Sequence, residues 1–542
     1  MTLLPDRSTL LLPFREGVSN GAPPLRVGVV LDRGPSPWVD ALLAFLRELP
    51  GIDVCLPALD NWHPAPAKRP SWLMDWLYSA SRARCDPFGD FELDGVESAE
   101  AIRDAGCGVL IWLAGCKDSS MDLSGLAGNG AFTVRLGERD RPIPFWDEVA
   151  NGQATSPVTI YWHESSFARG RAVRKVETST FQGLFFTLNA EEPLVAAIRV
   201  LAGLCLEIHQ GGRRFLERLR GFPEAPIEAL PVEYPTSMEA GRFVFRKLAQ
   251  NARRRWTVRG KTARWFVAMR PNRGASIADP GGDLTGFREV PLPRGVEAMA
   301  DPFVWEAGGR SYLFFEEVAA GASKGRLAVA EVLEDGSCAE RKIVLERPYH
   351  LSYPCVAQAD GELFLLPESY EAGRVDLYRF SRFPEEVEPV AQLVEGLALV
   401  DTTPFFLNDR WYFFTTTAPP FMESLLFWSN RLEGVWHLHP ASPISCSVRN
   451  SRSAGNLFRR NGRLYRPTQD CSARYGYAIQ VNEIVRLTPY EFEERPVNWI
   501  APAWSLGLLG THTWNESSRL QVIDGIRWQT SASQSCGEGA IP

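Results

Sequence analysis

Polar residues able to do chemistry recur at the starts of similar apolar runs in the C-terminal half of the chain. These residues are Asp301, Tyr353, Asp401, Arg452 and His512. Carboxylates accept hydrogen bonds from sugar hydroxyls, and two of them several ångströms apart supply the acid and the base, or the nucleophile, of glycosidic chemistry. A second polar set ends the runs that follow: Glu316 and Glu317, Glu368, and Gln469 with Asp470.

The segments that carry these residues repeat. Each is an apolar run, a tight polar turn and an aromatic-rich run, as in DPFVWEAGGRSYLFFEE (301–317) and YPCVAQADGELFLLPES (353–369). Two more follow, TTPFFLNDRWYFFTTT (402–417) and AGNLFRRNGRLYRPTQD (454–470). Strand-built repeats of this length indicate propeller blades. The turns are marked by Gly309, Gly361, Asp409 and Gly462, with Asp524-Gly525 interpreted as a fifth, so five blades are predicted.

The innermost strands of a propeller line its axis, so residues at equivalent places in different blades converge. We therefore predict one site at the axis, where acids that recur in register are brought together. The plainer alternative is that single acids cap turns or pair with arginines between blades. Tyr353, Tyr475 and Trp514 are candidates for stacking on sugar faces. The predicted catalytic residues are Asp301, Glu368 and Asp401, and the predicted substrate-binding residues are Glu317, Tyr353, Arg452, Gln469, Asp470, Tyr475 and His512.

Composition limits the class of protein. The 542 residues exceed what one core usually serves, so at least two domains are expected. A net charge of -7 argues against a nucleic-acid binder. The ten cysteines form no CxxC pair, which favours free, mostly buried thiols in a reducing compartment. We predict no metal, no cofactor, no membrane span and no signal sequence, and expect a cytoplasmic protein.

The front half alternates strand-like and helix-like segments. LRVGVVL (25–31) reads as a strand, PWVDALLAFLREL (37–49) as a helix, and 192–210 as a long helix. This alternation predicts an α/β domain with a parallel, Rossmann-like sheet, although the first loop lacks GxGxxG. The predicted division is an N-terminal extension (1–24), an α/β domain (25–235), a basic helical connector (236–262) and an all-β five-bladed β-propeller (263–542).

A basic segment runs from 242 to 273, with eleven Arg and Lys residues and no Asp or Glu. It is interpreted either as a solvated connecting helix or as an electropositive face for a phosphate-bearing substrate or anionic lipid.

The repeated motifs resemble a known family. ADPFVWEAGGRSYLFFEE, LVDTTPFF and SRSAGNLFRRNGRLYRPTQDC are similar to the N-terminal propeller domain of plant glucosamine inositolphosphorylceramide transferases, over roughly 265–530. That domain belongs to the wider five-bladed group with arabinanases, levansucrases and invertases. The resemblance implies carbohydrate handling, with Asp301 as base or nucleophile, Glu368 as acid and Asp401 as supporting carboxylate. In the plant proteins a separate C-terminal domain is expected to carry the transfer, and we expect no such domain within these 542 residues.

The front half resembles the formyltransferase N-terminal fold over 130–173. The Asn and His that such enzymes use read here as Thr133 and Arg135, and the Asp turn reads as 168–171, Ala-Arg-Gly-Arg. The replacement arginines suggest a pocket for an anion, and the plainer interpretation is a degenerate scaffold. His163 and Glu164 form either a site or a turn pair. N-formyl transfer is therefore disfavoured.

Two main hypotheses remain open. The first is an enzyme that acts on a glycosidic bond, by transfer or hydrolysis, of a sugar, glycolipid or nucleotide-sugar. The second is a non-catalytic glycan-binding or scaffold module that serves a glycosyltransferase. Carboxylates that are far apart or paired with arginines favour the second. Oligomeric state is not predicted.

Overall fold

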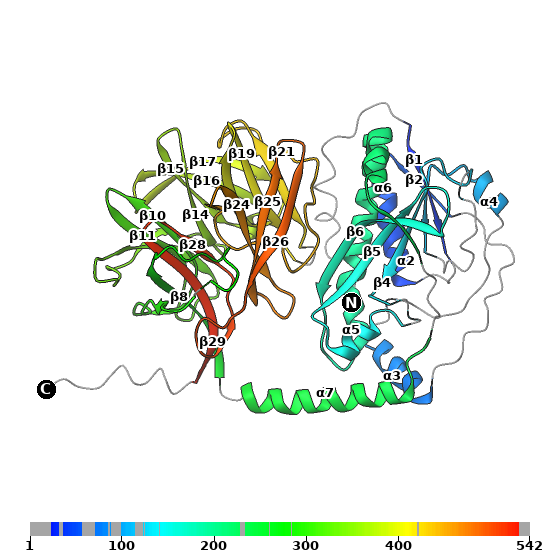
Figure 1. The fold of residues 1–542 in the computed structure, drawn as a ribbon, viewed down its shortest axis with the longest axis horizontal. Helices are drawn as coiled ribbons and strands as arrows, with labels where there is room; N and C mark the ends of the chain where they lie inside the picture. Colours follow the sequence, from blue (N-terminus) through cyan, green and yellow to red (C-terminus); the bar gives the residue numbers. More distant parts are fainter. Residues whose placement is uncertain are drawn as a thin grey trace. The chain divides into compact units, whose positions relative to one another are not determined.

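The computed structural model describes two compact units, divided between Arg253 and Arg254, and each is treated by itself (Figure 1). Most of the predicted N-terminal extension lies outside the described residues. The residues described are 23–31, 36–56, 71–84, 87, 99–113, 123, 125–139, 141, 143–227, 233–258, 261–282, 284–419 and 422–530.

The first unit contains a seven-stranded sheet in the order β2-β1-β3-β4-β5-β6-β7. The strands from β2 to β4 pair in parallel, as their helix-rich connections predict. The pairs from β4 to β7 are antiparallel, so the expected parallel sheet is only half right. The strands are β1 (Leu25–Val30), β2 (Ile52–Cys55), β3 (Val109–Trp112), β4 (Ala131–Leu136), β5 (Thr155–His163), β6 (Arg169–Ser179) and β7 (Glu224–Pro226).

Helices flank this sheet. Helix α2 begins where Ser36 caps the Val39 amide, and it buries its apolar stripe. The helices are α2 (Pro37–Arg47), α3 (Trp72–Arg82), α4 (Ala99–Asp104), α5 (Trp146–Asn151), the 3₁₀ helix η2 (Phe186–Ala190), α6 (Glu191–Arg220) and α7 (Ser237–Val258).

Helix α6 is longer than the predicted 192–210 because the helix continues past a break at Gly212, which has a positive φ of 48°. Together with η2 it is long and apolar enough to cross a membrane by length and composition, which the sequence prediction did not anticipate. However, 72% of its apolar window is buried inside the protein, and it packs on β5 and β6. Its burial is that of a core helix.

Helix α7 opens with a capping box, in which Glu239 accepts from the Thr236 amide at 2.7 Å and donates its own amide to Thr236 Oγ1 at 3.3 Å. The basic segment that follows does not form one face. Lys247 is buried and donates to Gln182 Oε1 at 2.8 Å, and Arg246 donates to the Val149 carbonyl. Basic residues beyond 260 lie in the second unit. Arg246 and Lys247 are therefore not available to the predicted electropositive face, which otherwise stays a prediction.

The second unit is the predicted five-bladed β-propeller (Figure 1). Five separate antiparallel sheets follow one another along the chain, and the inner strands β10, β14, β18 and β22 contact each other in series. The strands, blade by blade, are β10 (Val296–Ala307), β11 (Arg310–Ala319), β12 (Gly325–Val332) and β13 (Lys342–Leu345); β14 (Ser352–Ala359), β15 (Glu362–Glu368), β16 (Arg374–Arg382) and β17 (Glu386–Glu395); β18 (Leu399–Leu407), β19 (Arg410–Thr417), β20 (Ser424–Ser429) and β21 (His437–Leu438); β22 (Arg452–Ser453), β23 (Phe458–Arg460), β24 (Arg463–Asp470), β25 (Ala478–Leu487) and β26 (Phe492–Ile500); β27 (Leu508–Gly510), β28 (Trp514–Glu516), β29 (Leu520–Thr530), β8 (Lys261–Pro271) and β9 (Arg288–Glu289).

The fifth blade closes the ring. Strand β8, the first of the propeller in the sequence, pairs antiparallel with β29, the last, along the whole of both strands. This pairing joins the two ends of the unit and leaves no open edge between the first and last blades. Packing between blades supplies the core: the apolar residues 364–366 of β15 belong to one cluster with residues of the first and third blades such as Phe303 and Trp411.

Four of the five predicted turns are confirmed. Each has two central residues with positive φ, as in Asp360-Gly361 (49° and 84°), which suits the twist of a hairpin. The fifth prediction is wrong, because Asp524 and Gly525 lie inside β29 and the blade turns between β28 and β29 instead.

Several of the described cysteines are buried, while Cys85, Cys116 and Cys536 lie outside the described residues. The sulfurs of Cys55 and Cys107 lie 3.2 Å apart. They meet over Gly28 of β1, where a Cβ would lie 2.6 Å from the sulfur of Cys107.

Candidate functional site

Three inner strands each present one predicted site residue through the same backbone distortion. Asp301, Tyr353 and Asp401 have φ of 50°, 48° and 52°, and the ladder to the next strand slips at each place. A left-handed conformation is uncommon for Asp and costly for the bulky Tyr. Its recurrence in three blades indicates that the bulge is built to aim these side chains at the axis.

Arg452 of β22 joins two of the predicted catalytic carboxylates. Its Nε donates to Asp401 Oδ2 at 2.6 Å, and its terminal nitrogen lies 3.5 Å from Glu368 Oε2. Gln469 also donates to Asp401 Oδ2, at 3.0 Å, and the Asp401 amide donates to Glu368 Oε2 at 3.2 Å. Asp401 is therefore the principal counter-ion of Arg452. Pairing with an arginine is also what the non-catalytic alternative predicts for these acids.

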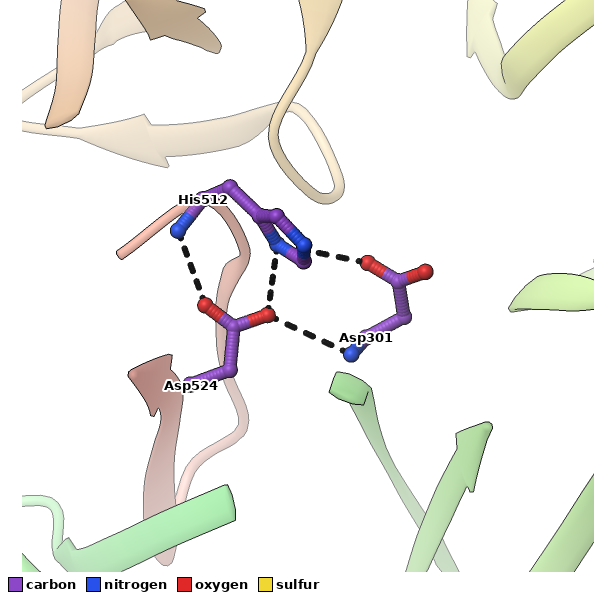
Figure 2. A group of neighbouring side chains, drawn as sticks. All are labelled: Asp301, His512 and Asp524. Atoms are coloured by element: carbon purple, nitrogen blue, oxygen red, sulfur yellow. Dashed lines mark hydrogen bonds and ion pairs between the residues drawn. The ribbon is translucent and has the colours of Figure 1, made fainter. Parts of the chain in front are cut away.

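His512 joins the third carboxylate to an acid that the sequence prediction missed (Figure 2). Its Nδ1 lies 2.6 Å from Asp524 Oδ2 and 3.6 Å from Asp301 Oδ1. Asp524 also accepts the amides of His512 and Asp301, and Asp301 accepts the Thr513 hydroxyl at 2.6 Å. These contacts form two groups of three buried residues, and the acids of the two groups are electrostatically coupled. We call the six residues together the axial cluster: Asp301, Glu368, Asp401, Arg452, His512 and Asp524.

Asp301, His512 and Asp524 place one ligand atom each within 4.8 Å of the others, a spacing that a metal ion could use. The protein already supplies a cation there. Burial alone would lower the pKa of His512, but the Asp524 carboxylate outweighs it and raises the pKa of the imidazole to about 9. The resulting imidazolium balances the charge of the two carboxylates beside it.

The other acids differ in protonation. Burial raises the pKa of Glu368 well above its usual range, with the Asp401 charge adding to the effect. Burial raises the pKa of Asp301 to about 6, against the lowering effect of His512. Burial also raises the pKa of Glu316 to about 8; this side chain lies 3.5 Å from His350 Nε2. Burial thus favours the protonated form of Glu368, while the neighbouring His512 favours the carboxylate form of Asp301.

Tyr475 provides an exposed face beside these buried groups. Its side chain is 52% exposed, yet its ring lies 5.1 Å from the Arg452 guanidinium and 5.5 Å from the His512 ring. A half-exposed aromatic ring held against the cluster is suited to stacking on the apolar face of a sugar. The binding role of Tyr475 is compatible with this exposure and stays a prediction.

Two other predicted stacking residues are fully buried. Tyr353 receives a hydrogen bond from the Gly455 amide at 2.8 Å and bonds to Thr403 Oγ1 at 2.8 Å, which ties three blades together. Trp514 packs on Phe458. Neither ring reaches the surface, so their roles are structural and not in stacking.

Two predicted binding acids also lie outside the cluster. Glu317 is completely buried and paired with Arg326 and Arg341 of its own blade, whereas its neighbour Glu316 is electrostatically coupled to the cluster acids. Side chains alternate along a strand, so a shift of one residue moves a carboxylate away from the axis. Asp470 accepts from the Trp499 indole at 2.9 Å, while Gln469 faces Asp401.

In the first unit the formyltransferase-like positions are engaged in structure. Thr133 bonds to His163 Nε2 at 2.8 Å, and burial lowers the pKa of His163. Arg135 lies over the Tyr161 ring, and Arg169 pairs with Glu224. The arginines that suggested an anion pocket thus have partners. Glu164, the neighbour of His163, pairs with Arg220, so the two do not act as one site.

Comparison with known proteins concerns the propeller. Residues 288–530 match the family described as glucosamine inositolphosphorylceramide transferase 1, N-terminal. The rice (Oryza sativa subsp. japonica) glucosamine inositolphosphorylceramide transferase 1 is 33% identical over 208 residues, and the Arabidopsis thaliana protein is 30% identical over 247. These matches span 37% and 44% of this chain but only 28% and 32% of the relatives' length.

Solved structures of low similarity also align. A GH43 β-xylosidase/α-arabinofuranosidase from a compost metagenome aligns with a TM-score of 0.34 and 14% identity, over 48% of this chain and 94% of the enzyme. An α-L-arabinanase from Cellvibrio cellulosa aligns with a TM-score of 0.29 and 12% identity, over 36% of this chain and 77% of the enzyme. Similarity at this level carries no argument about activity.

Proposed function

We propose that the propeller binds a sugar at the axial cluster and acts on a glycosidic bond, by transfer or hydrolysis. One observation carries this proposal: Glu368, whose pKa is raised by burial, and Asp301, whose carboxylate faces His512, belong to one buried cluster with a half-exposed Tyr475 beside it. Glu368 serves as the acid that protonates the leaving oxygen, and Asp301 as the base or nucleophile. Asp401 supports them by holding Arg452 in place.

The names of the relatives suggest the substrate class. They are transferases of glucosamine to inositolphosphorylceramide, and the shared segment is the propeller. We propose a phosphoinositol-bearing lipid as acceptor and a nucleotide-sugar as donor, in a cytoplasmic protein. Arg452 and the imidazolium of His512 are the cations of the cluster that suit an anionic substrate.

The test is turnover by the full chain. Purified protein is incubated with a panel of nucleotide-sugars and inositolphosphorylceramide, and separately with aryl glycosides, with products identified by mass. Glu368→Gln and Asp301→Asn are expected to lower turnover by at least about a hundredfold, the usual contribution of general acid-base catalysis. Glu362→Gln is the matched control, because Glu362 lies at the far, exposed end of the same strand. Normal turnover in Glu368→Gln would remove this residue from the mechanism.

A second candidate is a non-catalytic sugar-binding module. Its support is the Arg452 bridge, since both Glu368 and Asp401 contact this cation. This alternative predicts saturable binding of the lipid head group without product, and Glu368→Gln would then bind normally. Tyr475→Ala is the control for misfolding. Its half-exposed ring can be removed without leaving a cavity, so this variant should stay folded while its sugar binding weakens.

A further inference from the structure

Two helices of the first unit expose large apolar side chains. Trp72 and Trp76 of α3 are 77% and 62% exposed, and Met238, Phe245 and Leu248 of α7 are 64%, 76% and 57% exposed. Single exposed apolar residues are ordinary, but five on two helices, two of them tryptophans, form a surface that water does not favour. We call these five residues the α3–α7 face.

The fold explains why they lie at one end of the unit. The opposite sides of both helices pack into the same core cluster, where Leu77 of α3 and Phe243 of α7 join Trp146 and Phe186. Figure 1 shows α3 beside the first turns of α7. Trp72 and Trp76 stand four residues apart, and so share one side of their helix, as Met238, Arg242 and Phe245 do on theirs. The exposed sides therefore point away from the shared core.

Charge selects the partner. Arg242 and Arg253 are exposed on α7, and no acid occurs between Glu239 and Asp279 in the sequence. Glu239 itself is engaged by Thr236, and Arg141 lies 3.7 Å from it. The protein as a whole is acidic, with a net charge of -7, so this basic helix stands out against its surroundings. An anionic partner with an apolar interior matches both features.

We propose that the α3–α7 face binds the surface of an anionic lipid bilayer. The tryptophans sit among the head groups, Phe245 and Leu248 enter the acyl boundary, and Arg242 contacts lipid phosphates. The sequence predicted a lipid contact through residues 242–273. We limit this contact to helix α7 and add helix α3, which carries no basic run. The inference stands on the first unit alone and does not depend on the reaction at the propeller axis.

The experiment is vesicle sedimentation with the full chain. Vesicles of phosphatidylcholine are compared with vesicles containing about one third phosphatidylglycerol. We expect binding to the anionic vesicles that weakens as salt is raised, and little binding to neutral ones. Trp72→Ser/Trp76→Ser and Phe245→Ser/Leu248→Ser should each weaken binding by about tenfold or more, since burying one such side chain is worth that factor.

The control variant is Val435→Ser/Leu506→Ser, which removes two equally exposed apolar residues (76% and 93%) from the propeller. It should bind vesicles like the unmodified protein, and circular dichroism should show all variants folded because the altered side chains are exposed. The proposal is overturned if neutral and anionic vesicles bind equally, if neither binds, or if the control weakens binding as much.

Two other occupants would also overturn it. A dimer that Phe245→Ser/Leu248→Ser dissociates, seen by light scattering, would make the face an interface between copies. Hydrogen-exchange protection of α7 that depends on Val435 or Leu506 would instead make the propeller its partner.

Discussion

Replacing Arg452 with methionine tests the electrostatics of the axial cluster. Arg452 and Asp401 are both buried, and their hydrogen bond of 2.6 Å is the shorter of the two contacts that Arg452 makes with the cluster carboxylates. Methionine keeps much of the volume but leaves the Asp401 carboxylate with Gln469 as its remaining side-chain donor. An uncompensated buried charge of this kind costs about 3–5 kcal/mol. Burial favours the neutral form of Glu368, so its 3.5 Å contact with Arg452 is expected to contribute less than the contact with Asp401.

The assay is urea and thermal unfolding of the full chain, with hydrogen exchange on peptides from β18 and β22 to assign the change to the propeller. A loss of this size should lower the melting temperature of the propeller by about 6–20 °C. The double variant Arg452→Met/Asp401→Asn should recover most of the loss, because it removes the buried charge together with its partner. A cost below about 1 kcal/mol for Arg452→Met, or no recovery in the double variant, would refute the pairing.

Three further predictions test separate parts of the structure. The pKa of His512 is raised to about 9, so the protonated ring contributes about 3 kcal/mol to the free energy of unfolding. This contribution is present below pH 6.5, the ordinary pKa of histidine, and is lost as the pH rises through 9. The free energies of unfolding measured near pH 6 and near pH 10 should therefore differ less in His512→Gln than in the unmodified protein. Tyr353→Phe should cost about 1–3 kcal/mol in urea unfolding because it leaves the Gly455 amide without its acceptor, and an unchanged midpoint would contradict the buried role. Mild oxidation with diamide should link Cys55 to Cys107 in the folded protein, because their sulfurs already lie close together. Diamide is reduced as the two thiols are oxidised to the disulfide. Peptide mapping identifies the linked cysteines, and pairing of either one with another cysteine would contradict the strand register.

The blade architecture was predictable because it depends on local signals. Turn residues such as Asp360-Gly361 adopt the positive φ that a tight hairpin needs, and apolar alternation sets the strands on either side. The same rule failed at Asp524-Gly525, where a turn-like dipeptide continues a strand because β8 pairs along it. Asp524 was missed as a site residue for that reason, since local sequence carries no sign of a partner more than 200 residues away.

The site was predictable in part. Repeat position placed Asp301, Asp401 and His512 in one site, and these residues are electrostatically coupled in the structure. It chose Glu317 over Glu316, although Glu316 is the one coupled to the cluster acids, because one residue of register decides which side chain faces the axis. It also treated Tyr353 as a surface for sugar, although the packing of three blades encloses it.

By itself, the sequence determined the order of two units, the strand repeats and the set of polar residues at the strand starts, because these follow from periodicity and turn chemistry within one blade. Only the tertiary structure decided which residues are charged and which are reached by solvent. Burial and the pairing of Asp524 with His512 and of Asp401 with Arg452 arise between blades. The raised pKa of Glu368 and the exposure of Tyr475 depend on that environment, which no single segment of the chain provides.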